Sequence, residues 1–255
     1  MNRHYSKVRN IAEYRHRQKA CRHCDVFLMC FPAAVADGWR HLDELNLRHR
    51  SLARGRHLIL SGDPLRSLFV LRRGSLKCYE LSADGDALVT GFHVPGELVG
   101  LGAIGGNAHS SCAVALEELE YCEIPVRTFR QLQETNADVR RLTDELLRRN
   151  LRIAQRQLLI IRYLDARARV AMFFLDIAVR IGGQACTGRE FRLGMDRRDI
   201  ADYLGLTTGT VSRTITGFEQ AGLLDARGKT IRILDSKGLL SLAGPIRAPL
   251  DYAAP

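Results

Sequence analysis

Three cysteines stand close together near the start of the chain, in the stretch CRHCDVFLMC. They are Cys21, Cys24 and Cys30, and they follow a C-x2-C-x5-C spacing. Cysteine thiolates are soft, anionic ligands, and a set of four suits an iron–sulfur cluster or zinc. The spacing lets a short loop reach one corner of a cluster after another. We therefore expect a metal site in this arm, with a fourth thiolate from elsewhere in the chain.

Spacing alone does not choose the fourth ligand. Cys78, Cys112 and Cys122 all lie in segments that we predict to be strands. Most strand cysteines are small apolar core residues, so the residue type does not separate these three. We interpret Cys186, in a Gly-containing loop, as a spare thiol. Zinc is the main alternative to a cluster, because His23 sits in the arm and zinc sites often combine cysteine with histidine; an arm without metal is a third alternative.

The region that must position the fourth ligand reads as short strands, from about residue 56 to residue 125. Gly, Pro and Asp interrupt its hydrophobic segments, and Asp84-Gly85 is a hairpin signal. Many short strands separated by regular turns indicate a β-sandwich or a barrel-like roll.

A long helix is predicted directly after the strands, because residues 136–163 contain no Gly or Pro and helix formers dominate. Apolar residues recur along it at steps of four and three, the spacing of a coiled-coil seam or of a core stripe. A second stripe, Leu146, Ile153 and Ile160, lies beside the first. We expect the second stripe to pack on the roll and the first to form a dimer seam; burial of both within one subunit is the alternative. The seam residues are Leu147, Leu151, Ala154, Leu158 and Ile161.

The segment DRRDIADYLGLTTGTVSRTITGFEQAG has the pattern of a helix-turn-helix. Asp196 and Thr207 are suited to cap two helices, and Gly205 to make the turn between them. LLDARGKTIRIL predicts two short strands that form a wing with cations placed for phosphates. A helical hairpin with a polar outer face is the alternative. The expected DNA contacts are Thr208, Gly209, Thr210, Ser212 and Arg213, with Lys229 on the wing; Arg213 suits guanine O6 and N7.

The composition is compatible with this interpretation. The formal net charge is +10, which favours an anionic partner, although a basic solvated surface also accounts for it. No run of eighteen apolar residues exists, and the basic N-terminal stretch lacks the apolar segment of a secretory signal. We therefore expect a cytoplasmic protein with no membrane segment, whose seven cysteines serve as thiols or metal ligands.

These segments resemble the FNR-like branch of the cyclic-AMP receptor protein (CRP/FNR) superfamily, bacterial transcription regulators that sense oxygen through an iron–sulfur cluster. The resemblance covers nearly the whole chain and is carried by CRHCDVFLMC, GFHVPGELVGLGAIG, YCEIP and REFRLGMDRRDIADYLGLTTGTVSR. It implies an α+β fold: a cysteine-rich arm (1–35), a cyclic-nucleotide-binding-like β-roll (36–135), a dimerisation helix (136–164) and a winged helix-turn-helix (165–255). It also implies a [4Fe–4S] cluster on Cys21, Cys24, Cys30 and Cys122, the last through the match to YCEIP.

The resemblance implies a cluster-loaded homodimer that binds double-stranded DNA at palindromes similar to TTGAT-N4-ATCAA. Such a dimer controls anaerobic-metabolism promoters and contacts RNA polymerase, and oxygen converts it to monomers that bind DNA poorly. We expect no cyclic nucleotide, because Ser110 and Ser111 follow the GELVG motif without an arginine to neutralise a phosphate. We expect no enzyme either, because no Ser/His/Asp constellation, phosphate loop or Gly-rich dinucleotide motif is present.

Two residues depart from the family pattern. The recognition helix usually reads Glu-x-x-Ser-Arg, whereas this chain has Gly209. Glutamate can accept from cytosine N4 and glycine cannot, so we predict a relaxed or shifted preference at that base pair. Ala154 stands where the family resemblance implies an acid at the seam. Without that like-charge repulsion, we expect a dimer that depends less on its cluster.

The signal itself has alternatives. The same cluster could respond to nitric oxide, or the thiols Cys112 and Cys186 could respond to the cellular redox state. A zinc-stabilised regulator is the remaining alternative.

Overall fold

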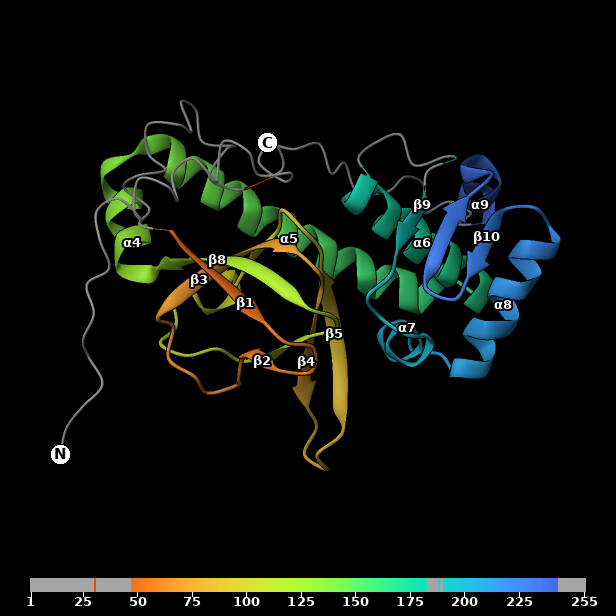
Figure 1. Ribbon diagram of the computed structural model, residues 1–255, viewed down its shortest axis with the longest axis horizontal. Helices are drawn as coiled ribbons and strands as arrows, with labels where there is room; N and C mark the ends of the chain where they lie inside the picture. The colour runs from red at the N-terminus through yellow and green to blue at the C-terminus, as the bar shows by residue number, and fades with distance from the viewer. Residues whose placement is uncertain (1–29, 31–46, 183–187, 189, 243–255) are drawn as a thin grey trace.

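Eight strands in the N-terminal half form two four-stranded sheets that pack against each other (Figure 1). The computed structural model describes residue 30 and residues 47–182, 188 and 190–242, so Cys21, Cys24 and Cys186 lie outside the described residues. The sheets have the orders β1-β8-β3-β6 and β2-β7-β4-β5, and neighbouring strands are antiparallel. The strands are β1 (Arg48–Leu52), β2 (His57–Ile59), β3 (Ser67–Arg73), β4 (Leu76–Leu81), β5 (Ala87–His93), β6 (Leu98–Val99), β7 (Cys112–Ala115) and β8 (Leu119–Pro125).

The two sheets share an apolar core. Leu71 of β3, Leu76 of β4 and Leu119 of β8 are each completely buried, and all three belong to one cluster. Gly74 turns the chain from β3 into β4 with φ 79°, and a Cβ there would lie 2.5 Å from the carbonyl oxygen of Glu118. Only glycine fits this turn without displacing the backbone that leads into β8.

Helices α4 (Val126–Thr135) and α5 (Ala137–Tyr163) follow the roll. Asn136 separates them and caps α5, because its side-chain oxygen accepts from Asp138 N at 2.9 Å and Val139 N at 3.2 Å. The 27 residues of α5 extend past the roll toward the C-terminal half (Figure 1).

The C-terminal half is a helical domain with a small three-stranded sheet of order β10-β11-β9. Strand β9, which pairs with β11, was not among the strands expected from the sequence. Together with the roll, this half confirms the predicted α+β fold class. The elements are α6 (Ala166–Gly182), β9 (Glu190–Arg192), α7 (Arg197–Leu204), α8 (Thr208–Gln220), β10 (Leu224–Arg227), β11 (Thr230–Ile233) and α9 (Ser236–Leu242).

The two halves meet along β5. Phe92 contacts Phe173 of α6 and Tyr203 of α7 edge to face, with ring centroids 6.1 and 5.3 Å apart. Burial in this contact raises the pKa of Tyr203 to about 12. Lys77 of β4 forms an ion pair with Asp199 of α7 at 2.6 Å, and both side chains are largely buried. The roll and the helical domain therefore share one apolar core with polar contacts at its edge.

Within the described residues, no helix is both long enough and apolar enough to cross a membrane.

The cap of α7 generates a stability prediction. Asp196 accepts from Asp199 N at 2.9 Å, and its own N–H donates to Asp199 Oδ2 at 3.2 Å, which is a reciprocal capping box. We expect Asp196→Ala to lower the free energy of unfolding by about 1 kcal/mol, because α7 loses its cap. Urea unfolding measures this. Asp202→Ala on the exposed side of α7 is the control and should leave stability nearly unchanged; equal effects of the two variants would contradict the capping role.

The same cap predicts a pH dependence. Burial by itself raises the pKa of Asp196, but hydrogen bonds from the backbone of Asp199 and Arg198 outweigh it and lower the pKa. A depressed folded pKa means that the contribution is present above the unfolded carboxyl value, about 3.9, and is lost as the pH falls through the folded value. The stability difference between wild type and Asp196→Ala should therefore shrink in acid.

Candidate functional site

The second helix of the helix-turn-helix presents a polar face to solvent. Thr207 caps α8 by accepting from Thr210 N at 3.1 Å, and Gly205 ends α7 with φ 63°. Val211, Ile215 and Phe218 are buried, so the opposite face of α8 points outward, on the side away from the roll (Figure 1). Of the predicted DNA contacts on α8, Thr210 is half-buried and the others are exposed, namely Thr208, Gly209, Ser212 and Arg213.

Arg213 lies over the space that Gly209 leaves. Its Nη2 is 3.5 Å from Thr210 Oγ1, and a Cβ built at Gly209 would lie 3.5 Å from its Nη1. That separation is an ordinary van der Waals contact, so the helix has room for a side chain at this position. The glycine is therefore not required by packing, and a longer side chain here would lie beside the Arg213 guanidinium.

The wing differs from the sequence expectation in one cation. Lys229 is half-buried and donates its ammonium to the carbonyl oxygen of Gly194, so the backbone of its own domain engages the charge that was expected to face phosphate. Arg227 and Arg232 are exposed cations of the wing; the side chain of Arg227 is 85% exposed and lies 3.1 Å from Asp225. The position of Arg227 directly before the Gly228 turn was the signal that could have identified it.

The outward face of α5 is an uncovered apolar stripe. Leu151 and Leu158 are 59% and 69% exposed, and Leu147, Ala154 and Ile161 are exposed as well. On the second stripe, Ile160 is buried in the core of the helical domain, and Leu146 packs on the core of the roll. Burial of both stripes within one subunit is therefore wrong for the described chain.

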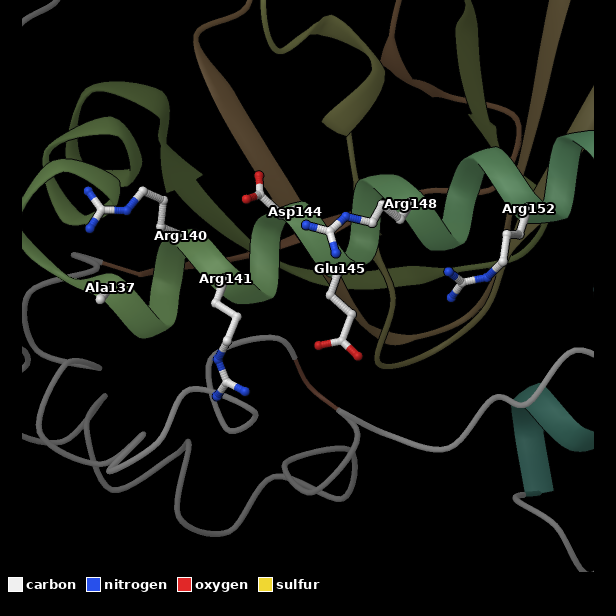
Figure 2. Close-up of a pocket in the computed structure, with 7 residues that line it drawn as sticks. All are labelled: Ala137, Arg140, Arg141, Asp144, Glu145, Arg148 and Arg152. Atoms are coloured by element: carbon white, nitrogen blue, oxygen red, sulfur yellow. The ribbon is translucent and has the colours of Figure 1, made fainter.

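Charged side chains flank this stripe. Figure 2 shows arginines and acids projecting from residues 140–152 of α5, and Arg141 forms an ion pair with Asp138 at 3.6 Å. An apolar stripe with a charged rim is the pattern of a helix that pairs with another helix. The four arginines are Arg140, Arg141, Arg148 and Arg152, and the acids are Asp144 and Glu145.

Cys122 is buried in the roll beside the ring of His49. It lies on β8, directly opposite His49 of β1 and Val70 of β3, and is 5% exposed. Arg72 lies with Nη1 3.2 Å from His49 Nδ1. Because a guanidinium is donor-only, this His49 nitrogen is an acceptor. Cys122 Sγ is 3.4 Å from the same nitrogen. The thiol of Cys122 therefore lies within hydrogen-bond reach of the His49 ring.

Cys30 packs on the same apolar core that contains Cys122. Cys30 is half-buried, whereas Cys122 is buried. Among the described residues, no group of three or more His, Cys, Asp or Glu side chains could hold a metal ion. Two of the four predicted ligands, Cys21 and Cys24, lie outside the described residues, so the four-thiolate set stays a prediction. A buried and a half-buried thiol beside one apolar core fit the chemistry of an iron–sulfur cluster.

A cavity of about 660 Å³ lies between the roll and the inner side of α5. Ser110 and Ser111 line it, as expected for the loop that follows the GELVG motif, but the arginines of its wall come from helices, Arg149 from α5 and Arg180 from α6. The absence of a cyclic nucleotide stays a prediction.

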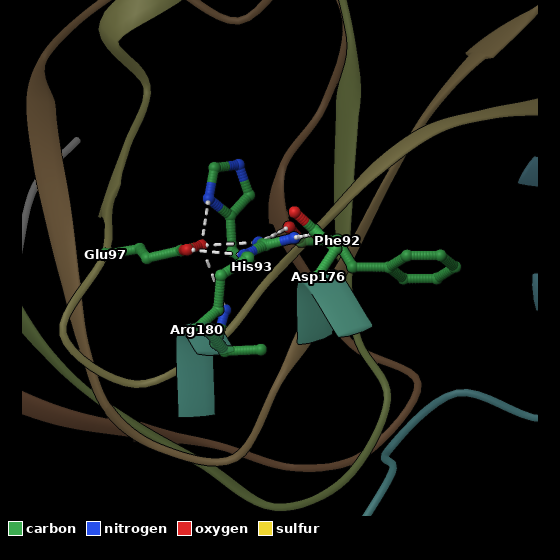
Figure 3. A network of polar contacts seen from close by, with 6 residues as sticks. Phe92, His93, Glu97, Asp176 and Arg180 are labelled. Carbon is green, nitrogen blue, oxygen red and sulfur yellow. Dashed lines mark hydrogen bonds and ion pairs between the residues drawn. The ribbon is translucent and has the colours of Figure 1, made fainter. Parts of the chain in front are cut away.

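A network of buried charges at this cavity was not foreseen from the sequence (Figure 3). Arg180 donates to both oxygens of Glu97 at 2.8 Å and also to the carbonyl oxygen of Phe92. Burial by itself raises the pKa of Glu97, but Arg180 and then His93 outweigh it and hold the pKa well below its usual range. Glu97, the acid of the GELVG motif, thus joins the roll to α6. It is 83 residues from Arg180 in the sequence, so no local pattern encodes this pairing.

Comparisons with known proteins agree with this arrangement. Residues 168–242 match the Crp-like helix-turn-helix domain, and residues 49–136 match the cyclic nucleotide-binding domain. The chain is 37% identical to the transcriptional activator protein anr of Pseudomonas aeruginosa, over 89% of this chain and 93% of that protein. It is 36% identical to the fumarate and nitrate reduction regulatory protein of Salmonella typhimurium, over 89% of this chain and 91% of that protein.

A solved structure is also similar. FixK2 from Bradyrhizobium japonicum superposes with a TM-score of 0.71 at 27% identity, covering 78% of this chain and 98% of that chain. The domain matches, the relatives and the geometry of α7, α8 and the wing exclude an enzyme. The chain belongs to the CRP/FNR family of DNA-binding transcription regulators.

Proposed function

We propose that this transcription activator senses oxygen through a [4Fe–4S] cluster held by Cys21, Cys24, Cys30 and Cys122. In this proposal the cluster-loaded homodimer binds palindromic DNA related to TTGAT-N4-ATCAA. There it controls promoters of anaerobic metabolism through contact with RNA polymerase.

The observation that carries the proposal is one shared core. Cys122 of β8 is buried in a cluster that also contains Val139 and Leu142 from the first turns of α5, and Cys30 packs on that cluster. Two of the proposed ligands, Cys30 and Cys122, therefore share a core with the start of the helix that carries the proposed dimer seam. A change in how the arm is held changes the packing of α5, which is a physical route from sensor to dimer.

The thiols have defined tasks in this scheme. Cys122 anchors the arm to the central part of a sheet, beside the ring of His49. When bound, the cluster supplies an oxygen-reactive centre that ties four thiolates together. With the thiolates tied, Cys30 and Cys122 are held to one another, and the arm stays against the roll.

Dimerisation and DNA reading follow from the exposed faces. Covering the apolar stripe of α5 with a second copy removes Leu151 and Leu158 from water. The two-fold pair then presents two α8 helices, and helix-turn-helix dimers read half-sites about 34 Å apart in successive major grooves. A palindrome is the DNA symmetry that matches such a dimer.

The cluster assignment predicts a difference between two equally buried cysteines. Cys122 and Cys112 are both 5% exposed on strands of the roll. We expect anaerobically purified wild type to be coloured, to contain iron and sulfide, and to bleach in air. Cys122→Ser should lose most of its iron, because one of four ligands is gone, whereas Cys112→Ser should keep it. Iron and sulfide analysis with visible absorbance measures this. A colourless zinc-containing wild type, or equal iron in the two variants, would overturn the assignment.

The seam predicts a second difference between two equally exposed leucines. Leu151 on α5 is 59% exposed and Leu81 at the end of β4 is 60% exposed. Leu151→Glu should weaken dimerisation of the anaerobic protein by more than about tenfold, because it puts two carboxylates into an apolar seam, and DNA affinity should fall with it. Leu81→Glu should change neither. Sedimentation and DNA titration measure both, and a dimeric Leu151→Glu protein would contradict this seam.

Gly209 predicts a change in base preference. Gly209→Glu places a carboxylate beside Arg213, where it can accept from cytosine N4, so preference at one base pair should increase by about 1–3 kcal/mol. Gly209→Ala is the control, since it gains helix propensity without a carboxylate. Selection from a randomised operator library measures the preference. The prediction is contradicted if the wild type prefers its bases as sharply as Gly209→Glu does at every base pair of the operator. The glycine would then not reduce discrimination between bases.

A further inference from the structure

The C-terminus of α7 is held by side chains from outside the helix-turn-helix. The last four carbonyls of a helix have no partner within it. In α7, backbone N–H groups of the following turn bond two of the four. The third, Tyr203 O, accepts from Gln157 Nε2 of α5 at 3.3 Å, and the last, Leu204 O, accepts from Arg169 Nη1 of α6 at 3.2 Å. The point at which the chain turns into the recognition helix α8 is therefore bonded to α5 and α6.

The same arginine also bonds the end of α5. Its Nε donates to Leu164 O at 2.9 Å, and its Nη2 donates to Ile161 O. Carbonyls at a helix C-terminus carry partial negative charge, so a cation is favourable there. Ile161 is also the last residue of the proposed seam. One guanidinium, that of Arg169, thus joins the end of the seam helix to the turn of the DNA-binding motif.

The backbone that carries Arg169 is itself fixed. Two residues, Leu164 and Asp165, separate α5 from α6. Leu164 is buried in the core of the helical domain. Asp165 starts α6, because its Oδ1 accepts from Ala168 N at 2.8 Å and its carbonyl accepts from Arg169 N at 3.0 Å. The guanidinium is therefore presented by a bend that has defined partners on both sides.

The arrangement requires the shape of arginine. A guanidinium offers five N–H groups in a rigid planar fork, whereas a lysine ammonium is a single point on a flexible stem. The three nitrogens of Arg169 each bond a different carbonyl. A Cβ built at Gly205 would lie 3.8 Å from Nη1, so the fork lies against the turn itself. Three residues separate Leu204 from Thr208, the first residue of α8, and a rotation at the turn therefore moves the reading face.

We propose that Arg169 is a positioning residue for DNA binding, which fixes α8 relative to the seam and thereby sets the half-site spacing that the dimer accepts. Gln157 supports it from α5. The inference rests on the proposed homodimer, in which each seam helix ends beside such a guanidinium. One added base pair between two half-sites turns one of them by about 34° and moves it by about 3.4 Å. A dimer tolerates that change only if its two α8 helices can shift, and the bonds of Arg169 oppose the shift.

The test measures spacing preference. Anaerobic wild type, Arg169→Gln and Arg169→Lys are titrated by fluorescence anisotropy with duplexes that carry the half-sites TTGAT and ATCAA. The spacer is four base pairs, or is shortened or lengthened by one or two, and a further duplex has a single half-site. We expect wild type to prefer one spacer at least about tenfold over the next, because the half-sites must match a fixed dimer. In Arg169→Gln this ratio should fall to about threefold or less, while single half-site affinity stays within about twofold.

The ratio separates positioning from stability. Loss of folded protein weakens binding to all duplexes alike and leaves the ratio of two affinities unchanged. Arg169→Lys should resemble Arg169→Gln, because it keeps the charge but loses the fork. Arg162→Gln is the matched control: Arg162 is exposed at the end of α5, 6.0 Å from the ring of Tyr163, and its loss should leave the ratio unchanged. Sedimentation should show all three variants as dimers.

Gln157→Ala gives a second, milder change. It removes one bond to the end of α7, so the spacing ratio should fall about twofold. This variant decides the matter if circular dichroism shows that the Arg169 variants do not fold. A wild-type ratio in folded Arg169→Gln, or in Gln157→Ala where the Arg169 variants are unfolded, would overturn the positioning role and leave the proposed function intact. A monomeric wild type without spacing preference would instead contradict the proposed homodimer, and the inference with it.

Discussion

The α5 helix carries two apolar faces, and the described subunit covers only one of them. Its inner face is fixed in the cores of the roll and of the helical domain, and the described residues leave the outer leucines uncovered. Full burial of a leucine contributes about 1.5–3 kcal/mol, and association costs about 4–15 kcal/mol in lost freedom. With four large, partly exposed apolar residues per subunit, the gain and the cost are of the same order. Pairing near balance would make dimerisation responsive to a small change elsewhere, and we expect Ala154 at the proposed seam to move this balance toward the dimer.

A change in the packing of the roll can act on α5 at the start of the helix. The first turns of α5 pack in the same core as Cys122, through Val139 and Leu142, and close-packed cores transmit displacements because they contain few voids. Asn136 fixes where α5 begins, since its side chain caps the helix just before these residues. In the proposed mechanism, Cys30 and Cys122 act on the start of α5, and the proposed seam lies further along the same helix.

Elements whose signals are local could be predicted from the sequence, and contacts between distant elements could not. The caps at Asp196 and Thr207 and the apolar spacing of α8 lie within a few residues, and the structure has both helices where those signals place them. Lys229 was expected to face phosphate, but it folds back on Gly194, because the wing packs beside the loop before α7. The pairing of Glu97 with Arg180 depends on how the roll docks on α6, which no window of sequence encodes. The assignment of Cys21 and Cys24 as cluster ligands rests on the resemblance alone, because both lie outside the described residues.

The docking of the two halves is itself specified by charge. Asp199 completes the capping box of α7 and also receives Lys77 of the roll, so one carboxylate both starts the first helix of the DNA-binding motif and orients it. Arg180 bonds to Glu97 through two nitrogens, and a bidentate pair fixes direction as well as distance. Apolar packing around Phe92 alone would tolerate small rotations, because the hydrophobic effect is not directional. These polar contacts remove that freedom, so the separation of two α8 helices in a dimer is set by the seam of α5 rather than by flexibility between the halves.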